Sequence, residues 1–128
     1  MRVEEVVTRC CSFRLDPGGF VHATIREGAT FEVTDARDAV AATWQIAGEQ
    51  RRPVLVDMRG VRTLPREARD YFLSDEAATK LRAVALVASS PVAKVIGNFI
   101  LRLGDHKVPT QIFTEQEAAR AWLGEHVA

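Results

Sequence analysis

The fold of this chain is decided by the stretch Pro53-Val54-Leu55-Val56-Asp57-Met58-Arg59-Gly60-Val61. Residues 53–56 are apolar without alternation, as expected for a strand that other elements cover on both faces. Asp57 ends this run, and Gly60 supplies a turn residue shortly after it. Because ligands and partners of open α/β sheets meet the carboxyl ends of the strands, the stretch predicts an α/β fold with a site just beyond Asp57.

The segments around this central strand predict the rest of the sheet. Residues 83–88 form a second apolar run without alternation, and residues 111–113 form a short strand. Residues 3–15 and 20–25 are typical of two strands joined by the turn residues 16–19. We therefore expect a mixed five-stranded sheet whose interior strands are parallel.

Four to five helices are predicted to cover this sheet. They span residues 35–47 after an N-cap at Thr34, two short segments opened by Pro65 and Ser74, residues 92–103 before Gly104, and a segment after a capping box at 114–117. The side chains expected to face the sheet are Val40, Trp44 and Ala47, then Val92, Val95, Ile96, Phe99, Ile100 and Leu103, and finally Ala118, Ala121 and Trp122. The chain is thus predicted to form a single domain over residues 1–128.

Composition and charge exclude several classes of partner. The chain has 17 basic and 17 acidic side chains, so it has no overall field of the kind that attracts nucleic acid. Its longest apolar run, residues 83–88, is far shorter than the roughly 20 residues of a membrane span. Glu4 and Glu5 stand where a secretory signal needs apolar residues. We expect a cytoplasmic protein.

Cysteine and histidine residues give no metal-binding pattern. Cys10 and Cys11 are adjacent, and neighbouring side chains on a strand point to opposite faces, which suits neither a disulfide nor a shared metal. His22, His106 and His126 are scattered and match no ligand spacing. We predict packed free thiols, no metal site and no cofactor.

The order of these elements, with residues 55–61 at its centre and residues 112–123 at its end, resembles the STAS superfamily, the fold of anti-sigma factor antagonists. Segments similar to those of stand-alone bacterial STAS-like or CRAL-TRIO-like proteins are Ala85-Leu86-Val87-Ala88-Ser89-Ser90-Pro91, Ile96-Gly97-Asn98-Phe99 and Pro109-Thr110-Gln111-Ile112-Phe113. The likeness covers residues 20–123 and implies a STAS-like fold, while it implies little about activity.

One departure from that family concerns its best-known activity. Phosphorylated antagonists carry an Asp-Ser-Ser-Gly type motif after the central strand, whereas this chain has Leu64-Pro65-Arg66-Glu67-Ala68, without a hydroxyl. We therefore expect no switching by phosphorylation at this place. A receiver domain is the rival α/β interpretation, but the opening strands lack the acidic pair that would hold its magnesium ion.

The candidate binding site follows the central strand and comprises Asp57, Arg59, Arg62, Arg66 and Arg69. Planar guanidinium groups and helix amides at this edge suit an anionic partner. Two structural alternatives stay open. Asp57 can instead accept hydrogen bonds from amides of its own loop. The arginines can form a solvated helix surface, since Arg66 and Asp70 have the spacing of a stabilising ion pair.

No nucleophile triad, phosphate-binding glycine loop or pair of catalytic carboxylates is recognisable, so we expect a protein that is not an enzyme. The leading hypothesis is a STAS-like binding or regulatory module that contacts a protein or a small anionic ligand over residues 57–69. The alternative is a carrier of an apolar or lipid-like ligand beneath the helix of residues 92–103, which requires an apolar cavity. A homodimer is open in both cases.

Overall fold

A computed structural model describes residues 4–102 and 107–127 of the protein. In this part of the chain the main sheet has six strands, in the order β1 (Glu5–Val7), β2 (Cys11–Leu15), β3 (Val21–Ile25), β5 (Arg52–Asp57), β7 (Leu81–Val87) and β8 (Thr110–Phe113). The first three strands pair antiparallel, and β3, β5, β7 and β8 pair parallel. The predicted α/β class with parallel interior strands is confirmed.

The sheet has one strand more than predicted, because the segment expected as a single strand over 3–15 turns back on itself. At that turn the amide of Thr8 donates to the carbonyl of Cys11 at 2.8 Å, and the amide of Cys11 donates to Oγ1 of Thr8 at 3.2 Å. β1 and β2 therefore form an antiparallel hairpin. Val3, the expected start of that strand, lies outside the described residues.

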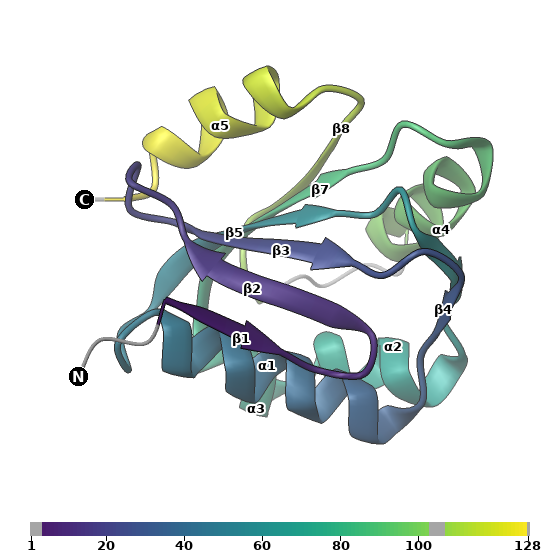
Figure 1. Ribbon diagram of the computed structural model, residues 1–128. Coiled ribbons are helices and arrows are strands. Elements are labelled where there is room, and N and C mark those ends of the chain that lie inside the picture. The colour runs from purple at the N-terminus through teal and green to yellow at the C-terminus, as the bar shows by residue number, and fades with distance from the viewer. Residues whose placement is uncertain (1–3, 103–106, 128) are drawn as a thin grey trace.

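The helices are distributed unequally over the two faces of the sheet (Figure 1). One face is covered by α1 (Val33–Ile46), α2 (Arg66–Phe72), α3 (Asp75–Ala78) and α4 (Pro91–Arg102). The other face carries α5 (Gln116–Gly124), which packs against β5, β7 and β8. Figure 1 shows no helix in front of β1, β2 and β3, so half of this face is open.

The two faces have separate apolar cores. The larger core lies under the four helices and includes Phe13, Val21, Phe31, Val54, Met58 and Leu86. The smaller core lies under α5 and consists of Phe20, Leu55, Ala85, Val87, Ala119 and Leu123. A separate short ribbon, β4 (Ala29–Thr30) paired with β6 (Val61–Thr63), lies beside the larger core. No helix of the described segments has the length and apolar character needed to cross a membrane.

The start of α1 differs from its predicted N-cap. The helix begins after Glu32 instead of Thr34, and Oδ2 of Asp35 accepts the amide of Glu32 at 2.8 Å. Arg9, in the turn between β1 and β2, donates from Nε to Oδ1 of the same buried carboxylate at 2.9 Å. The sequence did not predict this helix start for two reasons. The amide of Glu32 is bound by Asp35, the third residue of the helix, and Asp35 also binds Arg9, which is distant in sequence.

The orientation of α4 is the largest departure from the predicted packing. The helix was expected to place its large apolar residues on the sheet. Ile96 and Ile100 do pack against the larger core while partly buried, but the fully buried residues of the helix are Ala93 and Gly97. A Cβ atom on Gly97 would lie 2.6 Å from Cδ1 of Ile112, so this side of the helix packs directly on β8. Three large side chains stay exposed as a result: Val92 (50%), Val95 (71%) and Phe99 (47%). The expected members Leu103 and Gly104 lie outside the described residues.

The last helix also presents a different face from the predicted one. It begins after Glu115, so Thr114 is not its N-cap. Its buried residues are Ala119 and Leu123, whereas Ala118 and Ala121 are exposed. Trp122 is half-buried and packs its ring 5.8 Å from that of Phe113, between ring centres. The expectation that Ala118 and Ala121 face the core is wrong.

Candidate functional site

The loop after β5 begins at Asp57, whose buried carboxylate is held by its own loop. Oδ1 accepts the amide of Arg59 at 3.1 Å, and Oδ2 accepts Nη2 of Arg59 at 2.8 Å and Nε2 of Gln116 at 3.5 Å. Burial alone would raise the pKa of Asp57, but the hydrogen bonds from Arg59 outweigh it, and the pKa lies below its usual value. Asp57 thus accepts a hydrogen bond from an amide of its own loop, which is one of the two alternatives that the sequence left open.

Gly60 then carries the loop past the end of β3. Its carbonyl accepts the amide of Gly28 at 2.8 Å. A Cβ atom at Gly60 would lie 2.5 Å from the carbonyl oxygen of Ile25, so the two backbones are in direct contact here. On either side of Gly60, Met58 and Val61 are buried in the larger core. The predicted site thus begins before this backbone contact along the chain and ends after it.

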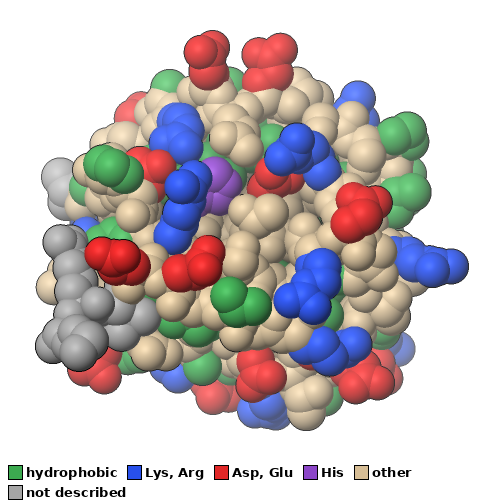
Figure 2. Space-filling view, viewed as in Figure 1, with side chains coloured by type: hydrophobic (Ala, Val, Ile, Leu, Met, Phe, Trp, Pro, Cys, Tyr) green, Lys and Arg blue, Asp and Glu red, His purple; other side chains and the backbone are tan. Residues whose placement is uncertain are grey.

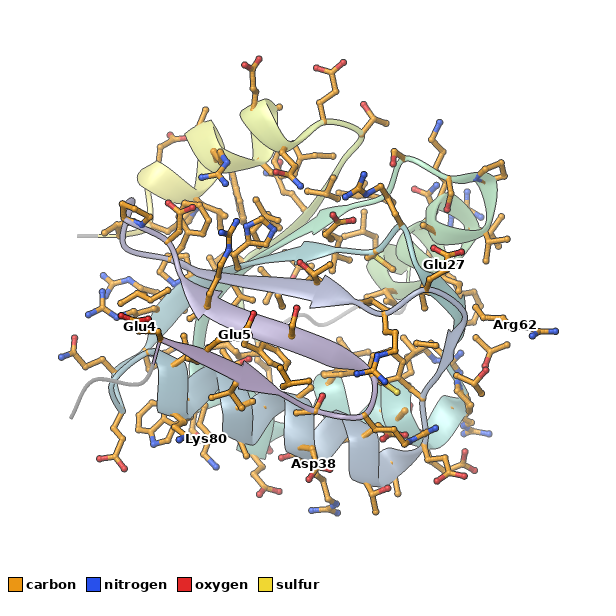
Figure 3. All side chains as sticks on the ribbon, viewed as in Figure 1. Glu4, Glu5, Glu27, Asp38, Arg62 and Lys80 are labelled. Atoms are coloured by element: carbon orange, nitrogen blue, oxygen red, sulfur yellow. The ribbon has the colours of Figure 1, made fainter. Side chains whose placement is uncertain are left out.

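The five predicted site residues therefore do not form one patch. Asp57 and Arg59 lie near α5, whereas Arg62, Arg66 and Arg69 follow β6 on the side of α2 and α4. Figure 3 shows Arg62 pointing away from the ribbon into solvent.

The two arginines on α2 differ from each other. Nε of Arg66 lies 3.7 Å from Oδ2 of Asp70 in an exposed ion pair. This agrees with the alternative in which Arg66 belongs to a solvated helix surface. Arg69 instead places its guanidinium 4.6 Å from the ring centre of Phe99. Its Nε is buried and has no hydrogen-bond partner in the described part of the chain. The guanidinium is thus held against an exposed aromatic ring.

An open groove lies between β6 and α4, with a volume of about 530 Å³. Its lining residues are Arg62, Thr63, Leu64, Pro91, Val92, Val95 and Ile96. We call it the β6–α4 groove. Phe99 continues the apolar surface one turn further along α4, since residues three or four apart share a helix face. The sequence predicted the helix but placed these side chains in the core.

A second cluster occupies the open half of the sheet and was missed by the sequence analysis. Its residues are Arg14, Asp16, His22, Asp57 and Arg120, which we call the His22 cluster. His22 is buried and its Nδ1 lies 3.3 Å from Nη2 of Arg14, its partner across the β2–β3 ladder. Arg120 of α5 donates from Nη1 to Asp16 at 2.8 Å. Figure 2, which faces this half of the sheet, shows cationic side chains gathered around a histidine.

The cluster holds His22 in its neutral form. Burial lowers the pKa of the imidazole, and the nearby charges of Arg14 and Arg120 lower it further, against the opposing effect of Asp57 and Asp16. The pairing of Arg14 with His22 across the two strands is the feature from which this cluster could have been predicted. It follows from alternation once the hairpin register is known, but residues 16–19 allow more than one register.

An apolar cavity of about 140 Å³ lies inside the larger core. It is enclosed mainly by β2, β3, β5, β7 and helices α1, α2 and α4, with Phe13, Phe31, Val54, Leu86 and Ile100 among its lining residues. This is the feature on which the carrier alternative depends.

Comparison with known proteins gives one result. A family model described as Domain of unknown function (DUF7793) matches residues 13–127. The chain belongs to this family. Comparison with curated proteins and with solved structures gives no match. The matched residues include the whole β6–α4 groove and the whole His22 cluster, so both lie within the family domain.

The thiols and carboxylates of the described residues form no metal site. No group of three or more potential ligands comes together among residues 4–102 and 107–127. Cys10 and Cys11 are both free and both buried. Burial raises the pKa of Cys11 to about 12, so its thiol stays protonated and unreactive near neutral pH.

Proposed function

We propose that this protein is a binding module that takes an acidic, amphipathic segment of a partner protein into the β6–α4 groove. The observation that carries the proposal is the row of exposed apolar side chains on α4, namely Val92, Val95 and Phe99. Scattered exposed apolar residues are ordinary, but a contiguous patch beside a groove is typical of an interaction site. The close packing of Gly97 on Ile112 supports this, because it keeps the large side chains outside.

The charges beside the groove favour an acidic segment. Arg62 lines the groove, and Arg69 lies over Phe99. Arg102 follows Phe99 by three residues and shares its side of α4. The carboxylate of Asp70 is already paired with Arg66. Complementary charge would steer an acidic segment to this surface and set its orientation.

A second copy of the chain fits the groove less well. A two-fold axis through α4 would place the same surface on both sides of the interface. Arg62, Arg69 and Arg102 would then face identical cations. Like charges across an interface oppose association, so we take the partner to be a different protein.

The STAS resemblance is consistent with this proposal but is not needed for it. Binding at the groove uses no catalytic step and no phosphorylated hydroxyl, so we treat the protein as a non-enzymatic regulatory or binding module. The site differs from the one expected from the sequence. Arg62 and Arg69 take part through the groove, while Asp57 and Arg59 are committed to each other.

A designed peptide pair tests the proposal. We would label an 18-residue amphipathic helix of leucine and glutamate, and its leucine and lysine counterpart, and follow binding by fluorescence anisotropy and by amide chemical shifts. The acidic peptide should bind and perturb residues along α4 and β6. Val95→Asp should weaken it at least tenfold, which corresponds to about 1.4 kcal/mol.

Val7→Asp is the matched control, because Val7 is also an exposed valine (58%) but lies on β1. It should leave peptide binding unchanged. Equal binding of the basic peptide, or an equal effect of both substitutions, would reject the proposal. Sedimentation that shows a dimer dissociated by Val95→Asp would assign the groove to a second copy instead.

A carrier function is the second candidate, and the interior cavity favours a narrow form of it. Drug-sized ligands occupy pockets of about 300 to 1,000 Å³. A cavity of about 140 Å³ is closer to an engineered one of about 150 Å³ that accepts benzene. We therefore propose a benzene-sized apolar ligand for this candidate in place of a lipid. Benzene should raise the unfolding temperature of the protein, and Ala39→Leu, at a lining position, should abolish that shift.

A further inference from the structure

The half of the sheet that α5 does not cover carries a set of polar side chains. Across the strands, Arg14 faces His22 and His22 faces Leu55, while the next row brings Ser12, Thr24 and Asp57 together. Side chains of one row point to the same face of a sheet. This half of the face is therefore polar, although the rest of it is apolar under α5.

The hydrogen bond between Arg14 and His22 determines where the imidazole proton lies. A guanidinium group can only donate, so Nδ1 of His22 accepts from Arg14 and the neutral ring carries its proton on Nε2. Among the described residues, Nε2 has no hydrogen-bond partner, and it is not enclosed as a buried unpaired atom. A donor is thus available at the surface of the cluster.

Arg120 supplies further donors from the opposite side of the cluster. It uses Nη1 for Asp16 at 2.8 Å and lies 5.2 Å above the ring centre of Phe20, measured from Cζ. One ion pair leaves most of its five N–H groups free for another acceptor. Arg120 follows Gln116 by four residues on α5, so both face the open half of the sheet.

The arrangement differs from a hydrolytic triad. Ser12, His22 and Asp57 share the face, but Asp57 is bound to Arg59 and Gln116, and Nδ1 of His22 is bound to Arg14. A triad needs its carboxylate on Nδ1 and its nucleophile on Nε2. Donors without a paired base suit binding instead of acyl transfer.

We propose that Arg14, His22 and Arg120 bind a small oxyanion on the open half of the sheet. The anion would accept from Nε2–H of His22 and from the two guanidinium groups. Guanidinium groups suit phosphate and carboxylate alike, so the group recognised is an oxyanion of either kind. This site lies apart from the β6–α4 groove and does not depend on the function proposed for it.

Binding should be linked to protonation of His22. The charged groups around the ring are Arg14 from β2, Asp16 from the following turn, Asp57 from β5 and Arg120 from α5. An anion placed among them offsets the two arginines and favours the imidazolium form. The pKa of His22 should therefore rise when the site is occupied.

Histidine signals measure this directly. We would follow the Cε1–Hε1 resonance of His22 from pH 5 to 8 at constant ionic strength in sodium chloride, sodium phosphate, sodium sulfate and sodium acetate. Phosphate should act saturably in the millimolar range and raise the titration midpoint of His22 by about one unit, equivalent to tenfold tighter binding to the protonated form. The resonance of His126, which follows the end of α5, should not respond to phosphate at constant pH.

Variants separate this site from a general effect of salt. Arg14→Gln and Arg120→Gln should each weaken phosphate binding at least tenfold, while Arg62→Ala and Val95→Asp should leave it unchanged. An effect of phosphate and sulfate without acetate would indicate a phosphate-type ligand, and an equal effect of acetate a carboxylate. A midpoint no higher in phosphate, sulfate or acetate than in chloride, or a loss of binding with Arg62→Ala, would overturn the proposal.

Discussion

Gly60→Ala should destabilise the protein by about 1 to 2 kcal/mol. The new methyl group would lie 2.5 Å from the oxygen of Ile25 and 2.7 Å from the carbonyl group of Arg26, whereas real contacts of this kind stay above 3.0 Å. These are backbone atoms, so one strand end must move by about 0.5 Å to remove the overlap. Overpacking costs about 1 to 3 kcal/mol, and the lower entropy of the unfolded alanine chain returns about 0.4 to 1 kcal/mol.

Gly124→Ala is the matched control for this substitution. Gly124 ends α5, and a Cβ atom there meets nothing within 4 Å. Alanine should be neutral at this position or stabilise the fold by up to about 1 kcal/mol. Urea unfolding with an unchanged dependence on denaturant would give both values. If Gly60→Ala proved as stable as the wild type, the close backbone approach would be refuted.

Three further outcomes can be checked by unfolding experiments. Leu123→Ala should cost about 3 to 4 kcal/mol, because Leu123 of α5 is fully buried in the smaller core. Trp122→Ala should cost about 1 to 2 kcal/mol, because Trp122 is only half-buried. Hydrogen bonds from Arg9 lower the pKa of Asp35, so its stabilisation is present above about pH 4 and is lost as pH falls through the folded pKa. Asp35→Asn should therefore flatten the acid limb of stability against pH. Burial lowers the pKa of His22, so the unfolded state takes up a proton first below about pH 6.5, and His22→Gln should reduce the fall in stability as the pH drops below that value.

The sequence predicted the parallel part of the fold because the relevant signals are local. The runs at 53–56 and 83–88 are apolar without alternation, and they lie in the strands β5 and β7 at the centre of the sheet. Gly48 follows the first helix, and its φ of 71° suits a residue without a side chain. The helix over 35–47 was also correct to within two residues at its start.

The rotation of α4 could not be predicted from its apolar pattern. The apolar residues cover so wide an arc that the helix can turn more than one side to the sheet. The choice depends on how closely the helix approaches β8, which is set by Gly97 against Ile112. The apolar pattern favoured the large residues as the buried ones, whereas Ala93 and Gly97 lie at the centre of the contact and Ile96 and Ile100 pack at its edge.

The candidate site was predicted only in part, for a related reason. Arg59 and Arg62 are three residues apart in sequence, but Arg59 binds Asp57, which also contacts Gln116 of α5, whereas Arg62 lines the groove beside α4. His22 and Asp57 are far apart in sequence, yet both face the open half of the sheet through the pairing of β3 with β5. Closeness in sequence therefore suggested one site for Arg59 and Arg62, which lie apart, and gave no sign that His22 and Asp57 share a face.

Equal numbers of acidic and basic residues do not imply an even surface. The chain has a net charge of zero, so it has no long-range field to attract a partner. Within that balance, Arg62 lines the β6–α4 groove, Arg69 lies over Phe99 and Arg102 ends α4, while Arg14 and Arg120 lie beside His22. Such local groups act over about one Debye length, roughly 8 to 10 Å at physiological salt. Both proposed sites should therefore recognise their ligands by contact and depend only moderately on ionic strength, unlike a protein that steers its partner from a distance.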